Sequence, residues 1–162
     1  MKTIKQGLAF GLLMLLSACA LYQKAPLTLD PVGPSPKEGS VSEHEGWLVV
    51  YSDWAIDANA NRHSQYAVVS DDGKLTQQVR NSNGQFDQGP TPVNLPAGSY
   101  KVTAQAAHFG KVIVPVRISS DHTTFVYLDG YDHVGKSLAA NTNMARLPNG
   151  NILGWVDAGK VN

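Results

Sequence analysis

The chain contains one cysteine among 162 residues, carries no net charge at neutral pH and has no apolar run of membrane-spanning length. A single cysteine excludes an internal disulfide, so a folded domain must be held together by apolar packing and backbone hydrogen bonds. The balance of 13 basic and 13 acidic residues, without a basic stripe, excludes nucleic acid as a partner. The apolar run from Gly7 to Leu16 is about half of the roughly 20 residues that a spanning helix needs, which excludes a permanent membrane span there.

The amino terminus has the three-part layout of an export signal. Two lysines precede the apolar run, and small residues follow it up to Cys19. The junction Leu16 to Cys19 resembles the lipobox of bacterial lipoproteins, in which the cysteine thiol receives a diacylglycerol. The resemblance implies that residues 1–18 are a signal peptide and that Cys19 is the lipidated first residue. A buried cysteine that ends a helix is the alternative, but this position, just before a Pro-rich stretch, favours the lipoprotein.

The same resemblance implies a location. Two or more acyl chains hold a protein stably at a membrane, because each buried methylene contributes about 0.8 kcal/mol. Ala20 stands where an inner-membrane retention signal of the enterobacterial type carries Asp, which implies the outer membrane. The expected protein is therefore anchored in the cell envelope through its lipid, with no spanning segment.

The processed chain divides into a tether and one domain. It has 144 residues, 11 basic and 13 acidic, which suffices for a single core. Residues 19–43 are rich in Pro, Gly and Ser without apolar periodicity, and this composition predicts a disordered, semi-extended tether. Residues 44–162 are rich in Val, Thr, Tyr and Gly, which predicts strands joined by tight turns, with order beginning near Gly46.

Apolar runs and turn residues predict the first strands. The run from Gly46 to Tyr51 predicts a strand that is buried on both faces or nearly so, with Trp47 and Tyr51 in the core. The polar segment from Asp53 to His63 predicts a short helix or a loop. Turn sequences predict two hairpins, which join residues 65–70 to 75–80 and residues 144–147 to 152–156.

Alternating residues predict a three-stranded meander over residues 100–106, 112–118 and 123–128. Pro115 cannot donate a backbone hydrogen bond, so it predicts an edge strand or a bulge in the second of these strands. The earlier strands can supply a second sheet that covers the apolar face of the meander. The predicted fold is all-β, an Ig-like or transthyretin-like antiparallel β-sandwich.

One stretch carries a family resemblance. The sequence Thr91-Pro92-Val93-Asn94-Leu95-Pro96-Ala97-Gly98-Ser99-Tyr100, followed by strands that end at Leu128, is similar to PEGA-type and carboxypeptidase-regulatory-like sandwich modules of bacterial surface proteins. The resemblance covers about forty residues and implies a non-catalytic module for adhesion, spacing or protein contact.

Residues 130–137, Gly-Tyr-Asp-His-Val-Gly-Lys-Ser, match the phosphate-binding pattern G-x4-G-K-[ST]. Only 25 residues follow Ser137, too few for the βαβ unit that makes such a loop work, so a Gly-bounded turn is expected. Neither a nucleotide nor another cofactor is expected. No metal site is expected either, because zinc-ligand spacing is absent among His44, His63, His108, His122 and His133.

Catalytic signals are weak and aromatic ones are stronger. The chain has no G-x-S-x-G elbow, and its close carboxylates lie where solvation explains them, at Glu43, Glu45, Asp53 and Asp57. Three aromatic residues near loops could stack on sugar rings, contact a protein, or simply close the ends of the sandwich: Trp54, Tyr131 and Trp155. We expect a non-catalytic binding or structural module with an envelope protein or polysaccharide as partner; the alternative is a small envelope hydrolase acting on peptidoglycan or polysaccharide.

Overall fold

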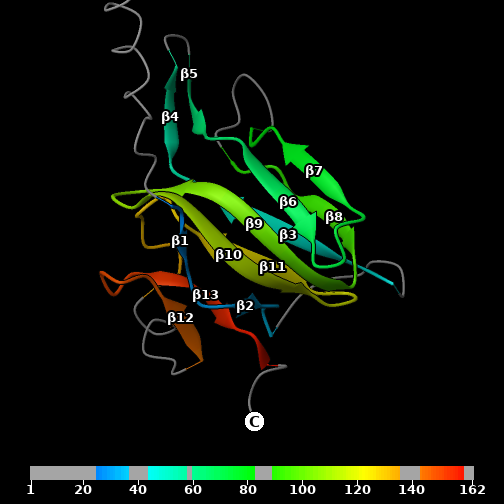
Figure 1. Cartoon of the computed structure of the whole chain (residues 1–162). Helices are drawn as coiled ribbons and strands as arrows, with labels where there is room; N and C mark the ends of the chain where they lie inside the picture. Colours follow the sequence, from blue (N-terminus) through cyan, green and yellow to red (C-terminus); the bar gives the residue numbers. More distant parts are fainter. Residues whose placement is uncertain (1–24, 37–43, 58–59, 83–88, 136–142, 159–162) are drawn as a thin grey trace, which may run out of the picture.

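The computed structural model describes residues 25–36, 44–57, 60–82, 89–135 and 143–158. Within these residues the regular structure consists of β-strands, and no α-helix is present (Figure 1). Residues 1–24, with the predicted signal helix and Cys19, lie outside the described part, as do residues 37–43 of the predicted tether. No helix among the described residues is long and apolar enough to cross a membrane.

The strands form two sheets and a separate hairpin. The large sheet has the order β12 (Met144–Arg146), β13 (Ile152–Val156), β2 (Val32–Gly33), β10 (Gly110–Ile118), β9 (Gly98–Ala106), β6 (Tyr66–Ser70), β7 (Thr76–Val79), and β1 (Leu27–Thr28) also pairs with β10. The small sheet has the order β11 (Thr123–Tyr127), β3 (Glu45–Tyr51), β8 (Val93–Pro96). The hairpin pairs β4 (Trp54–Asp57) with β5 (Ala60–His63) and extends from one end of the sheets (Figure 1).

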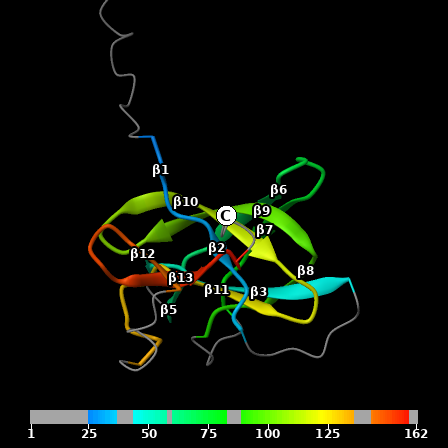
Figure 2. The same cartoon turned by 90° about the horizontal axis from the view of Figure 1, so that it is seen from below.

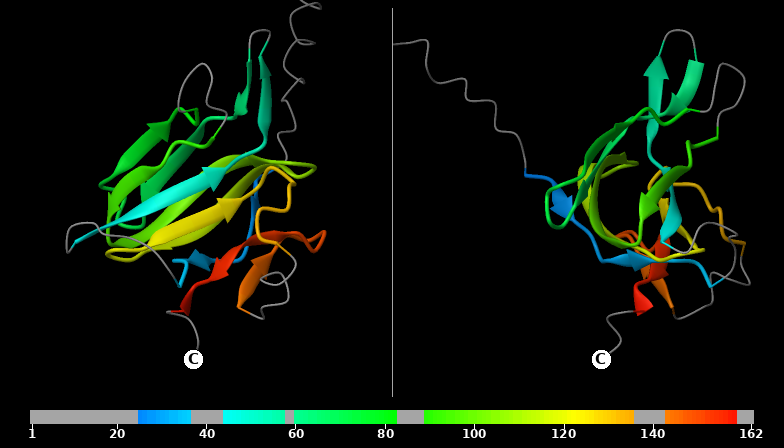
Figure 3. Two further views of the ribbon diagram at one scale, coloured as in Figure 1. Left: turned by 180° about the vertical axis from the view of Figure 1, so that it is seen from behind. Right: turned by 90° about the vertical axis from the view of Figure 1, so that its right-hand side faces the viewer.

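The large sheet curves around the small one, as Figures 2 and 3 show. Alternate residues of both sheets point into one shared core, including Val102 and Val114 from the large sheet and Val50 and Val126 from the small sheet. All four are 0% exposed. The core consists mainly of aliphatic side chains, whose burial at about 25 cal/mol per Å² is the main favourable contribution to folding.

Hairpins with clear turn signals are confirmed. Antiparallel pairing joins β6 to β7, β9 to β10 and β12 to β13. The turns that close the first and third of these contain Gly73 and Gly150, with φ angles of 70° and 89°. Glycine adopts these left-handed angles without the steric cost that a side chain would add. The short-range turn chemistry was therefore sufficient to predict these pairings.

The predicted three-stranded meander is wrong at its third strand. Strand β11 leaves β10 and pairs in parallel with β3, from Thr123 opposite Trp47 to Tyr127 opposite Tyr51. The turn before β11 is fixed to β3 as well, because the amide of Trp47 donates to the carbonyl of His122 at 2.9 Å. Parallel pairing also joins β10 to β1 and β2, so the sheets are mixed rather than purely antiparallel.

Part of the predicted tether belongs to the large sheet. Residues 25–36 contribute β1 and β2, and Leu29 and Val32 are only 8% and 0% exposed. This segment contains two apolar side chains at core positions, which outweigh the prolines around them. Strands β1 and β2 pair with one edge of β10, and β9 pairs with its other edge, so β10 is an interior strand of the sheet. The prediction that Pro115 marks an edge strand or a bulge is therefore wrong.

Pro115 fits inside the sheet because of its position. The carbonyl of Ile113 accepts from Leu29 at 2.8 Å, so the backbone groups of Ile113 and, two residues later, of Pro115 face β1 and β2. Strand β1 pairs with residues 112 and 113, and β2 pairs with residue 116. The missing amide proton of Pro115 therefore falls in the interval between the two short strands, where no ladder hydrogen bond is lost.

Candidate functional site

An aromatic surface covers the outer face of the small sheet. Leu48 and Val50 of β3 point into the core, so Trp47, Val49 and Tyr51 lie on the opposite face. Trp47 and Tyr51 are half-buried there, and the prediction that they belong to the core is wrong. The apolar run was read correctly as a strand, but its two largest side chains lie outside the shared core, on the face that bears the rings.

Six rings follow one another across this face, and we call them the ring chain: Trp54, His63, Tyr51, His133, Tyr127 and Phe125. The indole of Trp54 stacks on His63 with 4.4 Å between ring centroids, and His63 meets Tyr51 edge-on at 5.7 Å. His133 lies against Tyr51 at 4.1 Å and against Tyr127 at 5.2 Å, and Phe125 stacks parallel to Tyr127 at 6.0 Å. The ring chain joins five segments of the sequence, namely β3, β4, β5, β11 and the segment after β11, into one continuous row of packed rings.

The β4–β5 hairpin supplies Trp54 and His63, which pair directly across its two strands. The predicted helix or loop over residues 53–63 is therefore wrong. The cross-strand stack of Trp54 on His63 supports a hairpin, whereas no helical apolar periodicity was present to support a helix.

A buried polar network holds the base of this hairpin. The imidazole of His63 contacts the carbonyl of Ser52 through Nδ1, and the Ser52 hydroxyl donates to the carbonyl of Ser64 at 2.6 Å. The amide of Asn81 donates both to the Val50 carbonyl at 2.7 Å and to Ser52 Oγ at 2.8 Å. These contacts fix the orientation of the His63 ring.

A carboxylate and an imidazole meet in the middle of the ring chain. His133 Nε2 lies 2.8 and 2.9 Å from the two carboxylate oxygens of Asp129, whose side chain is 1% exposed. The amide of Tyr131 also donates to Asp129 Oδ1 at 3.2 Å. A buried carboxylate needs such partners, because an unpaired charge would be strongly destabilising.

The surroundings also affect the tyrosine hydroxyls. Burial, and then the negative charge of Asp129, raise the pKa of Tyr51, while burial and then Tyr51 raise the pKa of Tyr127 to about 12. Both hydroxyls are therefore harder to ionise than an ordinary tyrosine hydroxyl, and at neutral pH both can donate a hydrogen bond.

Beside Tyr127 and His133 the ring chain borders a groove of about 210 Å³, which we call the tyrosine groove. Tyr127, Tyr131 and His133 line one part of it, and Arg146 and Asn151 of the β12–β13 hairpin line the other. Tyr131 is 64% exposed, which is unusual for so large an aromatic side chain. The groove therefore combines aromatic surface with charged and amide groups.

The three aromatic residues singled out from the sequence occupy different places. Tyr131 lines the tyrosine groove, and Trp54 ends the ring chain. Trp155 pairs with Met144 and Gly33 within the large sheet and does not line the groove. Sequence reasoning did not assign to the site three rings that lie between Trp54 and Tyr131, or the carboxylate that contacts His133. These residues are Tyr51, Tyr127, His133 and Asp129. The only local signal was Asp129 four residues before His133.

The segment that matches the phosphate-binding pattern does not have the geometry of a phosphate-binding loop in its described part, residues 130–135. Gly130 has a φ of 81° and the residues after it form bends rather than the first turn of a helix. The amides of Tyr131 and Val134 donate to the carboxylates of Asp129 and Asp132 at 3.2 and 3.1 Å. Backbone amides occupied by carboxylates are unsuited to cradle a phosphate, whose charge the same carboxylates would repel. Lys136 and Ser137 lie outside the described residues.

The described lining of the tyrosine groove offers aromatic and hydrogen-bonding groups, with Asp132 as its one carboxylate. None of the described residues that line the tyrosine groove is Ser, Thr or Cys, and Nε2 of His133 is engaged by Asp129. In the described part of the chain, no three His, Cys, Asp or Glu side chains lie close enough together to hold a metal ion.

No protein-family model, curated protein or solved structure matches this chain. The PEGA-like resemblance therefore stays an expectation.

Proposed function

We propose that this chain is a lipoprotein of the bacterial outer membrane whose PEGA-like β-sandwich binds a cell-envelope polysaccharide without cleaving it. The junction Leu16 to Cys19 supports the lipid anchor, and the two sheets that share one core support a sandwich. Replacing Cys19 with Ser should abolish palmitate incorporation and release the protein from the membrane fraction. Continued labelling of that variant would contradict the anchor.

The tyrosine groove is the observation that carries the binding function. A sugar ring has an apolar C–H face and a rim of hydroxyls, so it needs an aromatic surface beside hydrogen-bonding groups. The exposed ring of Tyr131 can supply the aromatic surface. The hydrogen-bonding groups can come from Arg146, Asn151 and Asp132. The rings behind the groove pack on one another, so the surface is formed in advance and little ordering accompanies binding.

Binding can be tested by sedimentation of the purified full chain with insoluble peptidoglycan and with outer-membrane polysaccharide. Tyr131→Ala should weaken binding by about tenfold or more, because burying one aromatic side chain contributes about 1.5–3 kcal/mol and 1.4 kcal/mol corresponds to tenfold in affinity. Leu27→Ala is the matched control, since Leu27 is 42% exposed but lies on β1, away from the groove. Equal binding by wild type and Tyr131→Ala, or no binding to either polymer, would contradict the proposal.

The Asp129–His133 pair favours a second candidate, a small hydrolase of envelope polysaccharide. A carboxylate that orients an imidazole is a common arrangement for moving protons. Incubation of the full chain with peptidoglycan and measurement of released reducing ends separates the two functions. Release that is lost in His133→Gln would establish the hydrolase, and the absence of release from a polymer that the protein binds would leave the binding module.

A further inference from the structure

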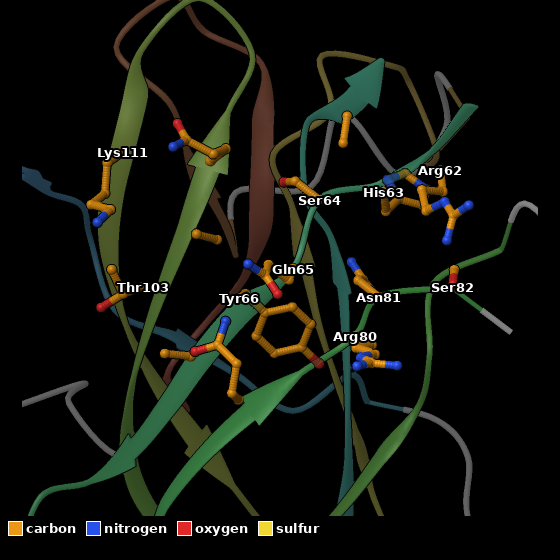
Figure 4. Close-up of a pocket in the computed structure, with 15 residues that line it drawn as sticks. Arg62, His63, Ser64, Gln65, Tyr66, Arg80, Asn81, Ser82, Thr103 and Lys111 are labelled. Carbon is orange, nitrogen blue, oxygen red and sulfur yellow. The ribbon is translucent and has the colours of Figure 1, made fainter. Parts of the chain in front are cut away.

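A second and larger cavity, of about 680 Å³, lies where the β4–β5 hairpin meets β6, β7 and β9. Three cationic side chains line it, Arg62, Arg80 and Lys111, and Figure 4 shows the two arginines on one side and the lysine on the other. None of the described residues that line it is Asp or Glu. We call this space the cationic cavity; no carboxylate within its described wall pairs with Arg80 or Lys111.

Polar side chains without charge make up much of the remaining wall. Amides of Gln65, Gln78 and Gln105 line the cavity, together with the hydroxyl-bearing side chain of Thr103. Asn81 also lines it, but its amide is fully engaged by Val50, Ser52 and Thr91 and holds the fold rather than offering a ligand contact. The wall therefore offers several donors and acceptors for a polar ligand.

Tyr66 is the second observation that points to a ligand. Its side chain is 1% exposed, and its hydroxyl has no hydrogen-bond partner among the described residues. Figure 4 shows this hydroxyl turned toward Arg80, inside the cavity wall. The Oγ of Ser64, which also lines the cavity, is buried without a partner as well. Buried hydroxyls are nearly always paired, so two orphaned donors in one cationic wall require an explanation.

We propose that the cationic cavity binds a small molecule that bears a carboxylate or phosphate group. The oxyanion lies between Arg80 and the hydroxyl of Tyr66. The planar guanidinium donates in pairs to carboxylate and phosphate oxygens, and a tyrosine hydroxyl donates to either. The amides and Lys111 address the remainder of the molecule.

Size and protonation agree with this ligand. The volume lies within the range of about 300–1,000 Å³ that holds whole small molecules and far exceeds a bare anion. Burial raises the pKa of Tyr66, so its hydroxyl keeps its proton and can donate at neutral pH. The cavity does not share lining residues with the tyrosine groove, so this inference does not rest on the proposed polysaccharide binding.

Calorimetric titration of the full chain with citrate and, separately, with inorganic phosphate tests the proposal. At least one anion should bind, and the one that binds more tightly identifies the group recognised. Tyr66→Phe should weaken that binding about tenfold, as expected for one hydrogen bond to a charged group. Arg80→Gln should weaken it at least as much, and both variants keep the volume of the side chain approximately.

Arg117→Gln is the matched control, because Arg117 is exposed on β10 but does not line the cavity. It should bind the anion as the wild type does. Equal weakening in Arg117→Gln and Arg80→Gln would mean that only the overall charge matters, which overturns the site. Absence of binding by both anions, or unchanged affinity in Tyr66→Phe, would overturn it as well. Circular dichroism of each variant confirms that the strands persist.

Discussion

Tyr66→Phe and Tyr100→Phe make the same chemical change at two buried positions, and we expect opposite effects on stability. Tyr66 is 1% and Tyr100 5% exposed. The Tyr100 hydroxyl donates to the carbonyl of Pro96 at 2.8 Å, whereas the Tyr66 hydroxyl has no partner among the described residues. Removing a paired hydroxyl loses a hydrogen bond, while removing an orphaned one relieves a desolvation penalty.

The expected magnitudes follow from these partners. An unpaired buried polar group costs about 1–3 kcal/mol, so Tyr66→Phe should raise the free energy of unfolding by about 1 kcal/mol. For a chain of this size that corresponds to about 2–4 °C in Tm. Tyr100→Phe should lower the free energy of unfolding by about 1 kcal/mol, since a neutral hydrogen bond contributes about 0.5–1.5 kcal/mol.

Urea denaturation of the full chain at pH 7, followed by tryptophan fluorescence, measures both changes. The gain of Tyr66→Phe should shrink or disappear when the anion that the cationic cavity binds is present in excess. The anion binds the native wild type more tightly than the native variant, so it raises the free energy of unfolding more for the wild type than for Tyr66→Phe. A loss of stability in Tyr66→Phe equal to that in Tyr100→Phe would refute the reasoning, since it would show that the Tyr66 hydroxyl has a partner in the fold.

Three further predictions concern the packing of the sheets. Gly154→Ala should lower the free energy of unfolding by about 2 kcal/mol in a thermal melt, because a Cβ there would lie 2.5 Å from the carbonyl oxygen of Phe125; a neutral result would mean that β13 and β11 are not so close. Val32→Ala should cost about 2 kcal/mol, since Val32 is 0% exposed, whereas a residue in a free tether would show no change. Raising the pH from 10 to 12 should destabilise the fold, because burial raises the pKa of Tyr127 to about 12 in the folded chain from an ordinary value of 10.0, so the unfolded chain loses this proton at lower pH than the folded chain does. Tyr127→Phe should reduce this loss by up to about 2 kcal/mol, and an unchanged pH profile would count against the burial of its hydroxyl.

Turn sequences and alternating residues were sufficient to predict the hairpins whose strands are neighbours in the chain. The Asp72-Gly73 turn and the alternation of residues 100–106 predicted strands and hairpins that the structure contains. The pairing of β11 with β3 could not be predicted in this way, because its partners are separated by 76 residues, from Trp47 to Thr123. Parallel pairing between distant strands has no turn sequence that specifies it.

The candidate site was only partly foreseeable for the same reason. Tyr131 was singled out as an aromatic residue near a loop, and it lines the tyrosine groove. Tyr51 was assigned to the core because a continuous apolar run does not reveal which face of a strand is covered by another sheet. The cationic cavity could not be anticipated, since Arg62, Arg80 and Lys111 come together only through the large sheet and the β4–β5 hairpin.

The central claim, that the tyrosine groove binds polysaccharide, is tested most directly by titrating the full chain with soluble glycan fragments of peptidoglycan while recording the amide and aromatic NMR signals. We predict saturable shifts that concentrate on Tyr127, Tyr131, His133 and Asn151, and their loss in Tyr131→Ala without change in the spectrum of the core. Shifts that map elsewhere, or that persist unchanged in Tyr131→Ala, would contradict the account.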